Sequence, residues 1–237
     1  MGRDVAPAAL ELTHVLYDAN SNTSFVLALV TLSPILLMAS YAALAVTTRD
    51  ILIINMWAGQ VACEALNWII KRMVKEERPA HTVGKGYGFP SSHSQYMTYF
   101  ATFLILHLYF RHRFVSTGSW IVDKLWRLTL YLALISWAGS VCYSRLFLTY
   151  HTPKQIMWGA GVGACFGILH YTITELVPAR FPQSTLGRLR RALLLHPLAT
   201  FVRLKDGWAV WEDGGREQEW QAWRRRWEQQ EPNLKRE

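Results

Sequence analysis

Long stretches of this 237-residue chain contain no charged side chain. Charged residues make up 18% of the sequence and hydrophobic residues 51%, which is poor in charge for a soluble domain. Five blocks carry at most one charge each: 25–46, 51–70, 94–110, 128–143 and 155–177. Each approaches the roughly 20 residues that cross a bilayer, whereas a soluble bundle would show charges along the outer face of every helix. The sequence therefore predicts an all-α, polytopic membrane bundle with about five transmembrane helices.

Cysteine is scarce, and its positions exclude two classes of small stabilised domain. Cys63, Cys142 and Cys165 all lie inside uncharged blocks, so neither a disulfide framework nor a zinc site is indicated. The polar segments between the blocks also lack any grouping of Asp, Glu and His with the spacing of metal ligands. We therefore expect no metal and no other cofactor.

The blocks divide the chain into three expected parts. Residues 1–24 contain acids and no compact apolar core before a cleavage site, so we expect a non-cytosolic N-terminal segment rather than a cleaved signal peptide. Residues 25–177 form the expected transmembrane domain. Residues 178–237 form a basic, Trp-rich tail. Trp220, Trp223 and Trp227 follow helical spacing beside three arginines, which predicts a helix that lies on the cytosolic leaflet or packs on the protein's own loops.

The basic residues indicate an orientation in the membrane. Arg49, the 111–127 loop and the tail would share one side of a five-span bundle, and short basic loops favour the cytosol. The opposite side is also basic, through Lys71, Arg72, Lys75, Arg78, Lys85 and Arg145. This conflict disappears if the second set binds an anionic substrate. We therefore expect a cytosolic tail and a 71–93 loop on the outer or lumenal side.

Three polar segments share that non-cytosolic face: "KRMVKEERP" (71–79), "FPSSHS" (89–94) and "SRLFLTYHTPKQ" (144–155). Arginine side chains match phosphate oxygens in geometry and charge, and two histidines can divide nucleophilic and acid–base work near neutral pH. The segments offer both, with three cations (Lys71, Arg78, Arg145), two histidines (His93, His151) and two hydroxyls (Ser91, Ser92). The combination predicts a site for phosphoryl transfer.

Two of these segments also contain helix-start signals. Ser92-His93-Ser94-Gln95 fits a capping box, and so does Thr152-Pro153-Lys154-Gln155 with proline at the first helical position. Each helix would present free backbone N–H groups and a positive dipole end to an anion. Taken singly, the same cations fit membrane anchors, the histidines and serines fit helix caps, and Gln155 fits half of a capping box. Their joint order and spacing favour the catalytic interpretation.

The three segments resemble the signature motifs of the type 2 phosphatidic acid phosphatase (PAP2) superfamily. Those motifs read Lys, six residues, Arg-Pro; Pro-Ser-Gly-His; and Ser-Arg, five residues, His, three residues, Asp. The chain matches them throughout except at two positions, where Ser92 replaces the glycine and Gln155 replaces the aspartate. The resemblance covers about 25–177 and implies the helical bundle of that superfamily.

The resemblance also implies roles for the residues. His151 would attack the terminal phosphorus to form a phosphohistidine, and His93 would protonate the leaving group and later take a proton from water. The phosphoryl oxygens would be held by Lys71, Arg78, Ser91, Ser92 and Arg145. Gln155 would orient His151 without the charge of an aspartate, and no metal would be needed.

Within the superfamily, the Pro-Ser-Ser-His-Ser-Gln stretch, Gln155 and "LTHVLYD" (12–18) resemble dolichyl-diphosphatases of the endoplasmic reticulum. This implies hydrolysis of dolichyl (polyprenyl) diphosphate to the monophosphate, which recycles the lipid carrier of protein N-glycosylation. The alternatives are a PAP2 phosphatase acting on phosphatidate, diacylglycerol diphosphate or a sphingoid phosphate, and an inactive membrane scaffold or transporter. Expected partners are the lipid substrate and membrane lipids, with no nucleic acid. Glu64, inside an uncharged block, would orient a catalytic group or bond to a neighbouring helix.

Overall fold

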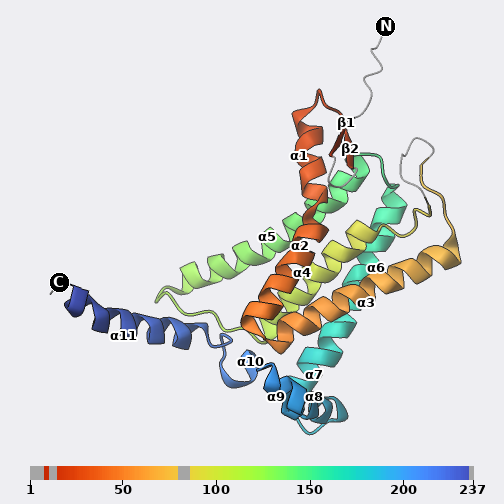
Figure 1. The fold of residues 1–237 in the computed structure, drawn as a ribbon. Coiled ribbons are helices and arrows are strands. Elements are labelled where there is room, and N and C mark those ends of the chain that lie inside the picture. Colours follow the sequence, from red (N-terminus) through yellow and green to blue (C-terminus); the bar gives the residue numbers. More distant parts are fainter. Residues whose placement is uncertain (1–7, 11–14, 80–85, 235–237) are drawn as a thin grey trace.

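The computed structural model describes residues 8–10, 15–79 and 86–234 (Figure 1). Lys85 and much of the 1–24 segment, including the start of "LTHVLYD", lie outside these ranges. The described chain is mostly helical, as expected for the all-α class. Its β structure is one short antiparallel hairpin of β1 (Ala8–Leu10) and β2 (Val15–Tyr17).

The helices run back and forth through the molecule before a series of short ones (Figure 1). They are α1 (Asn22–Thr31), α2 (Ser33–Thr48), α3 (Ile51–Val74), α4 (Ser92–Phe110), α5 (Trp120–Phe147), α6 (Pro153–Tyr171), the π-helical η1 (Thr172–Leu176), α7 (Val177–Arg180), α8 (Thr185–Leu195), α9 (Pro197–Phe201), α10 (Gly207–Val210) and α11 (Arg216–Leu234).

The first expected span is interrupted rather than continuous. Helix α1 ends at Thr31 and α2 begins at Ser33, with Pro34 in its first turn. Proline has no N–H to donate and its ring disfavours a continuous helix, which explains the break at this point. The Ser33 hydroxyl donates to the Val30 carbonyl at 2.6 Å and accepts from Trp137 Nε1 at 2.9 Å. The break is therefore fixed against α5.

Three stretches of the described chain are long and apolar enough to cross a membrane: Asn22–Thr48, Trp120–Phe147 and Pro153–Arg180. Helices α3 and α4 have 24 and 19 residues, but polar side chains lower their hydropathy. These polar groups are buried and bonded to each other, since Asn67 Nδ2 donates to Gln95 Oε1 at 2.9 Å and Gln95 Nε2 donates to the Cys63 carbonyl at 2.7 Å. The multi-pass helical bundle is confirmed, and the count of five spans stays a prediction.

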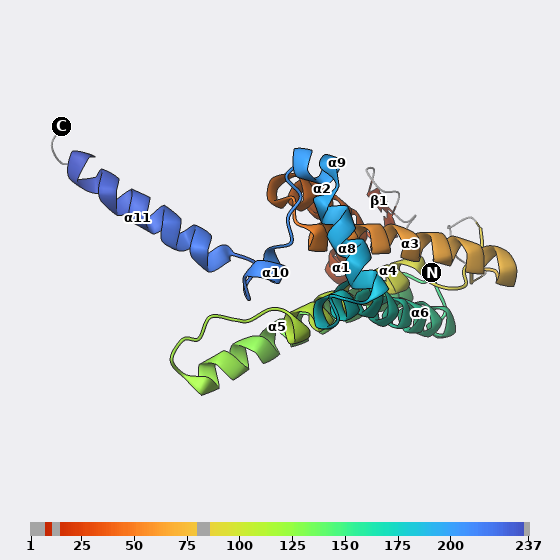
Figure 2. The same cartoon turned by 90° about the horizontal axis from the view of Figure 1, so that it is seen from below.

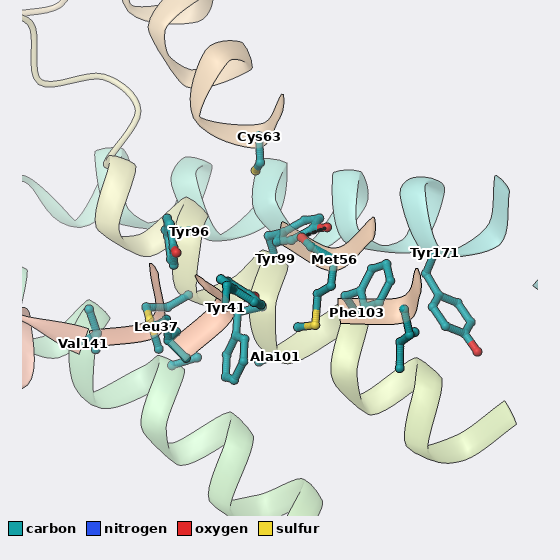
Figure 3. Packing of buried hydrophobic residues seen from close by; sticks show 14 residues of the cluster. Leu37, Tyr41, Met56, Cys63, Tyr96, Tyr99, Ala101, Phe103, Val141 and Tyr171 are labelled. Carbon is teal, nitrogen blue, oxygen red and sulfur yellow. Dashed lines mark hydrogen bonds between the residues drawn. The ribbon is translucent and has the colours of Figure 1, made fainter. Parts of the chain in front are cut away.

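Helix α4 lies at the centre of the bundle and packs most closely on α6. Its buried side chains, among them Met97, Tyr99 and Phe103, form the core with Cys63 of α3 and Tyr171 of α6 (Figure 3). The two backbones approach closely at Gly163, where a Cβ would collide with the Gln95 carbonyl. Small residues allow such contacts between membrane helices, where van der Waals packing replaces hydrophobic driving force.

The loops separate into the two sets that the sequence predicts. At one end, Lys205 N donates to the Arg49 carbonyl at 2.9 Å and Arg113 N to the Glu212 carbonyl at 2.8 Å. At the other end, Leu16 N donates to Tyr150 Oη at 2.8 Å and Ser91 N to the Gln155 carbonyl at 3.0 Å. The first end gathers the tail with the loops expected in the cytosol. The second gathers the three polar segments.

A buried ion network attaches the start of the tail to the bundle. Arg190 of α8 pairs with Glu175 of η1 at 3.0 Å and with Asp206 at 2.8 Å. Asn55 Nδ2 of α3 donates to Glu175 Oε1 at 2.8 Å. Glu175, the one charged residue of the block 155–177, is therefore bound from two sides, as a buried charge requires.

Helix α11 extends away from the bundle (Figures 1 and 2). Trp220, Trp223 and Trp227 are each about half exposed, and the rings of Trp223 and Trp227 stack on each other. The structure thus does not show the packing on cytosolic loops that the sequence left open. Placement of this helix on the membrane surface stays a prediction.

The α4–α6 contact predicts a stability difference between two glycines of α6. Gly163→Ala should lower the unfolding free energy by about 1–3 kcal/mol, the usual cost of overpacking, because backbone atoms cannot yield to the new methyl group. At Gly161 no atom of a neighbouring helix lies within 4 Å of the place that a Cβ would take, so Gly161→Ala is the matched control. Thermal unfolding of the detergent-purified variants measures both. Equal melting temperatures would contradict this account of the packing.

Candidate active site

The three polar segments meet at one end of the bundle, each at the end of a helix. Lys71 lies in the last turn of α3, Ser91 is the N-cap of α4, and Arg145 lies in the last turn of α5. Arg78 follows α3, His93 is in the first turn of α4, and the α5–α6 turn carries His151. His93 lies within electrostatic range of Lys71, Arg78, Arg145 and His151. The structure thus brings together the two histidines and the three cations.

A cavity of about 470 Å³ opens at this cluster. Its polar wall is formed by Glu64, Arg78, Ser92, His93, Arg145 and Tyr150. Its other wall is apolar and comes from the α1–α2 break, with Leu32, Pro34, Ile35 and Met38. Ile35 is 57% exposed on the bundle surface, so the apolar wall reaches the lipid-facing side. The cavity can hold an anionic group beside a hydrocarbon chain.

The two arginines in the cavity have hydrogen-bonding capacity left over. Arg145 is buried, and its guanidinium carbon lies 4.0 Å from the centre of the Tyr150 ring. The Nε atoms of Arg78 and Arg145 are both buried without a partner in the described structure. None of the salt bridges found among described residues involves either arginine. Buried donors without partners are rare, and an anionic ligand would satisfy these.

His151 is buried and held in one orientation by Gln155. Its Nδ1 lies 3.1 Å from Gln155 Oε1, which also accepts from the Thr152 amide at 3.3 Å. The Gln155 Nε2 group donates to the Glu77 carbonyl at 2.9 Å. These two backbone groups, one donor and one acceptor, fix which end of the amide is oxygen. Nδ1 of His151 must therefore carry the hydrogen, which leaves the Nε2 lone pair available for attack.

The surroundings of His151 also favour its neutral form. Burial lowers the pKa of His151 to about 3, and the neighbouring charges of Arg145, Arg78 and Lys71 act in the same direction. The hydrogen bond to Gln155 opposes this shift. A pKa below the ordinary value of about 6.5 keeps the imidazole uncharged at physiological pH. An uncharged imidazole is the form that can act as a nucleophile.

The capping box predicted at Thr152 is confirmed, and the one predicted at Ser92 is wrong. Thr152 and Gln155 bond reciprocally at the start of α6. Helix α4 instead has Ser91 as N-cap with no side-chain capping bond. Gln95 is drawn away from the helix start because Asn67 and Cys63 of α3 bind its amide. The first N–H groups of α4 still lack intrahelical acceptors and can face an anion.

Ser91 has its polar groups occupied by contacts within the protein. It is fully buried, its hydroxyl accepts from Ser94 Oγ at 3.0 Å, and its N–H donates to the Gln155 carbonyl at 3.0 Å. Ser91, Lys71 and His151 do not line the cavity, whereas Ser92 does. In this structure Ser91 holds the second segment against α6, and its contact with phosphate stays a prediction.

Two residues near the site were missed by the sequence analysis. Glu76, in the first segment, accepts from Gln155 Nε2 at 3.0 Å and pairs with Lys154 at 3.0 Å. Tyr150 lies between Arg145 and the N-terminal hairpin, where its hydroxyl accepts from Leu16 N. Tyr150 directly precedes His151 in the sequence, and this position is a signal that could have marked it as a site residue. Nothing in the spacing distinguishes Glu76 from Glu77.

Glu64 lines the cavity beside the catalytic candidates. Among the described hydrogen bonds none involves its carboxylate, so the bond to a neighbouring helix that the sequence left open is not seen. No group of three metal-ligating side chains occurs among the described residues. Metal independence itself stays a prediction.

Sequence comparison agrees with this arrangement. The profile of the "PAP2 superfamily" matches residues 50–177, which contain all three segments. The chain belongs to the PAP2 superfamily. Proteins named Dolichyldiphosphatase 1 from Rhinolophus ferrumequinum, Mus musculus and Homo sapiens are each 37% identical to it over 200 residues, which cover 82% of this chain and 80% of each relative. No solved structure matches the chain.

The site predicts distinct consequences for its two histidines. His151→Ala should abolish phosphate release from lipid phosphates, because Nε2 of this ring is the expected nucleophile. His93→Ala should lower kcat by about 10²–10⁴-fold, the usual worth of general acid–base help. Phosphate release and the melting temperature are measured on the same preparations. A folded His151→Ala variant with substantial activity would remove His151 from the nucleophilic role.

Proposed function

We propose that this PAP2 protein removes the terminal phosphate of dolichyl, or polyprenyl, diphosphate and releases the lipid monophosphate and inorganic phosphate. The observation that carries the proposal is the oriented, neutral His151 beside His93, next to a cavity lined by two arginines whose Nε atoms have no partner among the described residues. One wall of that cavity is apolar, as a lipid substrate requires.

The first step transfers the phosphoryl group to the enzyme. The lone pair of His151 Nε2 forms a bond to the terminal phosphorus while the bridging P–O bond breaks. The bonding electrons leave with the lipid monophosphate, and His93 donates a proton to it. Burial and the neighbouring cations lower the pKa of His93, and the negative charge of the bound diphosphate raises it again, so that the protonated ring is available for this step. Arg78, Arg145 and Lys71 bind the phosphoryl oxygens, with the first amides of α4, and so stabilise charge that is redistributed during transfer.

The second step returns the enzyme to its starting state. His93, now neutral, takes a proton from a water molecule whose oxygen forms a bond to phosphorus. The N–P bond breaks, its electrons return to His151 Nε2, and inorganic phosphate leaves. Gln155 keeps Nδ1 as the protonated nitrogen throughout. These residues supply the charges and protons that both steps need, and the proposal assigns no step to a metal ion.

The substrate class follows from three features. The relatives compared above carry the name dolichyldiphosphatase, and the apolar wall accommodates a hydrocarbon chain. Gln155 contacts His151 as an uncharged amide, so the ring receives less activation than from a directly bonded aspartate. A diphosphate compensates because its leaving group is a phosphate monoester rather than an alkoxide.

The proposed cellular setting is the endoplasmic reticulum membrane. The site would face the lumen, and residues 178–237 would lie in the cytosol. In this location the reaction would recycle the lipid carrier used in protein N-glycosylation. The basic loops at the opposite end from the site support this orientation.

The purified protein should release phosphate from dolichyl diphosphate with kcat/KM far above that for dolichyl phosphate or phosphatidate. The comparison uses the same detergent, and a parallel series contains EDTA. Activity should survive the chelator. Phosphatidate as the preferred substrate would replace this proposal with the broader lipid phosphatase function, and loss of activity in EDTA with recovery on adding magnesium would overturn the metal-free mechanism.

Orientation is tested with cysteines introduced at two exposed positions, Tyr87→Cys and Gln229→Cys. In sealed microsomes a membrane-impermeant maleimide should label position 229 directly and position 87 only after the membrane is permeabilised. The unsubstituted protein, with its three native cysteines, gives the background. Direct labelling at position 87 with protection at position 229 would invert the topology.

A further inference from the structure

A carboxylate stands one amide group away from the candidate nucleophile. Gln155 Oε1 lies 3.1 Å from His151 Nδ1, and Gln155 Nε2 donates to Glu76 Oε1 at 3.0 Å. The three side chains form one hydrogen-bonded series across two of the polar segments. In it, Glu76 occupies the far side of Gln155 from the imidazole.

The local structure holds each member of the series in place. The Glu76 carbonyl accepts from Gly88 N at 2.8 Å, and a Cβ on Gly88 would lie 2.8 Å from Gln155 Nε2. Gly88 therefore packs against the side-chain amide of Gln155, and its N–H also fixes the Glu76 backbone. Both hydrogens of Gln155 Nε2 are used, by Glu76 and by the Glu77 carbonyl, so the amide cannot turn without losing bonds.

Glu76 is ionised under physiological conditions. Hydrogen bonds from Lys154 and then from Gln155 hold the pKa of its carboxyl below the usual value. Lys154 is largely exposed, so solvent screens its charge and it neutralises Glu76 only in part. A negative charge thus remains on the carboxylate that binds the Gln155 amide.

We propose that Glu76 is a positioning residue that supplies carboxylate charge to His151 through the side-chain amide of Gln155. The inference rests on the proposed phosphohistidine function. A carboxylate that accepts from an amide N–H increases the negative charge on the amide oxygen, because hydrogen bonds in a chain polarise one another. The imidazole becomes positively charged as Nε2 bonds to phosphorus, and the polarised oxygen stabilises that charge through Nδ1–H.

The competing interpretation is purely structural. Glu76 could tie the residues that follow α3 to α6 through Lys154 and Gln155, with no influence on the reaction. The two interpretations differ in what happens when the charge is removed but the hydrogen bond from Gln155 is kept. Glu76→Gln makes this change, since its one side-chain oxygen can still accept from Gln155 Nε2, while the ion pair with the exposed Lys154 is lost.

The charge role predicts a loss in kcat without a matching change in KM. Glu76→Gln should lower kcat for dolichyl diphosphate by about 10- to 100-fold, the range seen when groups that orient a catalytic side chain are replaced. KM should change less than about threefold, because Glu76 does not line the cavity. The matched control is Asp18→Asn, which removes a carboxylate at the same end of the molecule that bonds only locally, to the Asn20 amide. The control should keep wild-type kcat.

A charge swap separates the two interpretations more sharply. Gln155→Glu alone places a second carboxylate about one hydrogen-bond length from Glu76, and like charges at this distance destabilise each other. The double variant, Glu76→Gln with Gln155→Glu, exchanges the carboxylate and the amide between the two positions. It keeps a single carboxylate, which now bonds directly to His151. Its kcat should exceed that of either single variant by at least about tenfold, since losses in coupled groups are not additive. A structural tether without influence on the reaction predicts wild-type kcat for Glu76→Gln, so the double variant would have no loss to recover relative to that variant.

The outcomes are distinct. A wild-type protein without activity on dolichyl diphosphate overturns the proposed function and this inference with it. An active wild type with an equally active Glu76→Gln variant overturns the inference alone. A double variant whose kcat does not exceed that of Glu76→Gln does the same. If Glu76→Gln fails to fold, as shown by its melting curve, the comparison of the double variant with Gln155→Glu still decides.

Discussion

The geometry of the candidate site depends on one side chain whose hydrogen-bonding groups are all used. The Gln155 amide oxygen binds His151 and the Thr152 amide, and its nitrogen binds Glu76 and the Glu77 carbonyl. Its backbone carbonyl accepts from Ser91, which brings in the second polar segment. Gln155 therefore fixes the tautomer of His151 and connects three segments that lie far apart in the sequence. Since it is fully buried, a missing partner would cost free energy.

The two ends of the bundle differ in whether a buried arginine is paired with a carboxylate. At the tail end, Arg190 is paired with Glu175 and Asp206, so its charge contributes to structure. At the site, Arg145 is more deeply buried than Arg190, but no carboxylate pairs with it in the described structure. Burying an unpaired charge is expensive, and membrane proteins retain such groups mainly for function. A phosphate group bound at Arg145 would recover the free energy lost in burying this charge.

The sequence predicted those parts of the fold and site that depend on local pattern. Uncharged blocks marked the long helices, and Thr152 with Gln155 marked the start of α6, because such signals act within one turn. The failures involve contacts between distant segments. The side chain of Gln95 is hydrogen-bonded to Asn67 and Cys63 of α3, so it forms no capping box. Glu76 and Gln155 meet only because the chain folds, and no periodicity in either segment encodes that contact.

The most direct test of the account is the identity of the phosphorylated atom. Wild-type protein is mixed with dolichyl diphosphate labelled in its terminal phosphate, quenched in base within milliseconds, and analysed for phosphohistidine by mass spectrometry and isomer-resolving chromatography. Because Nδ1 of His151 is occupied by Gln155, the account predicts label on Nε2 of His151. Label on Nδ1, on His93 or on any other residue would contradict it.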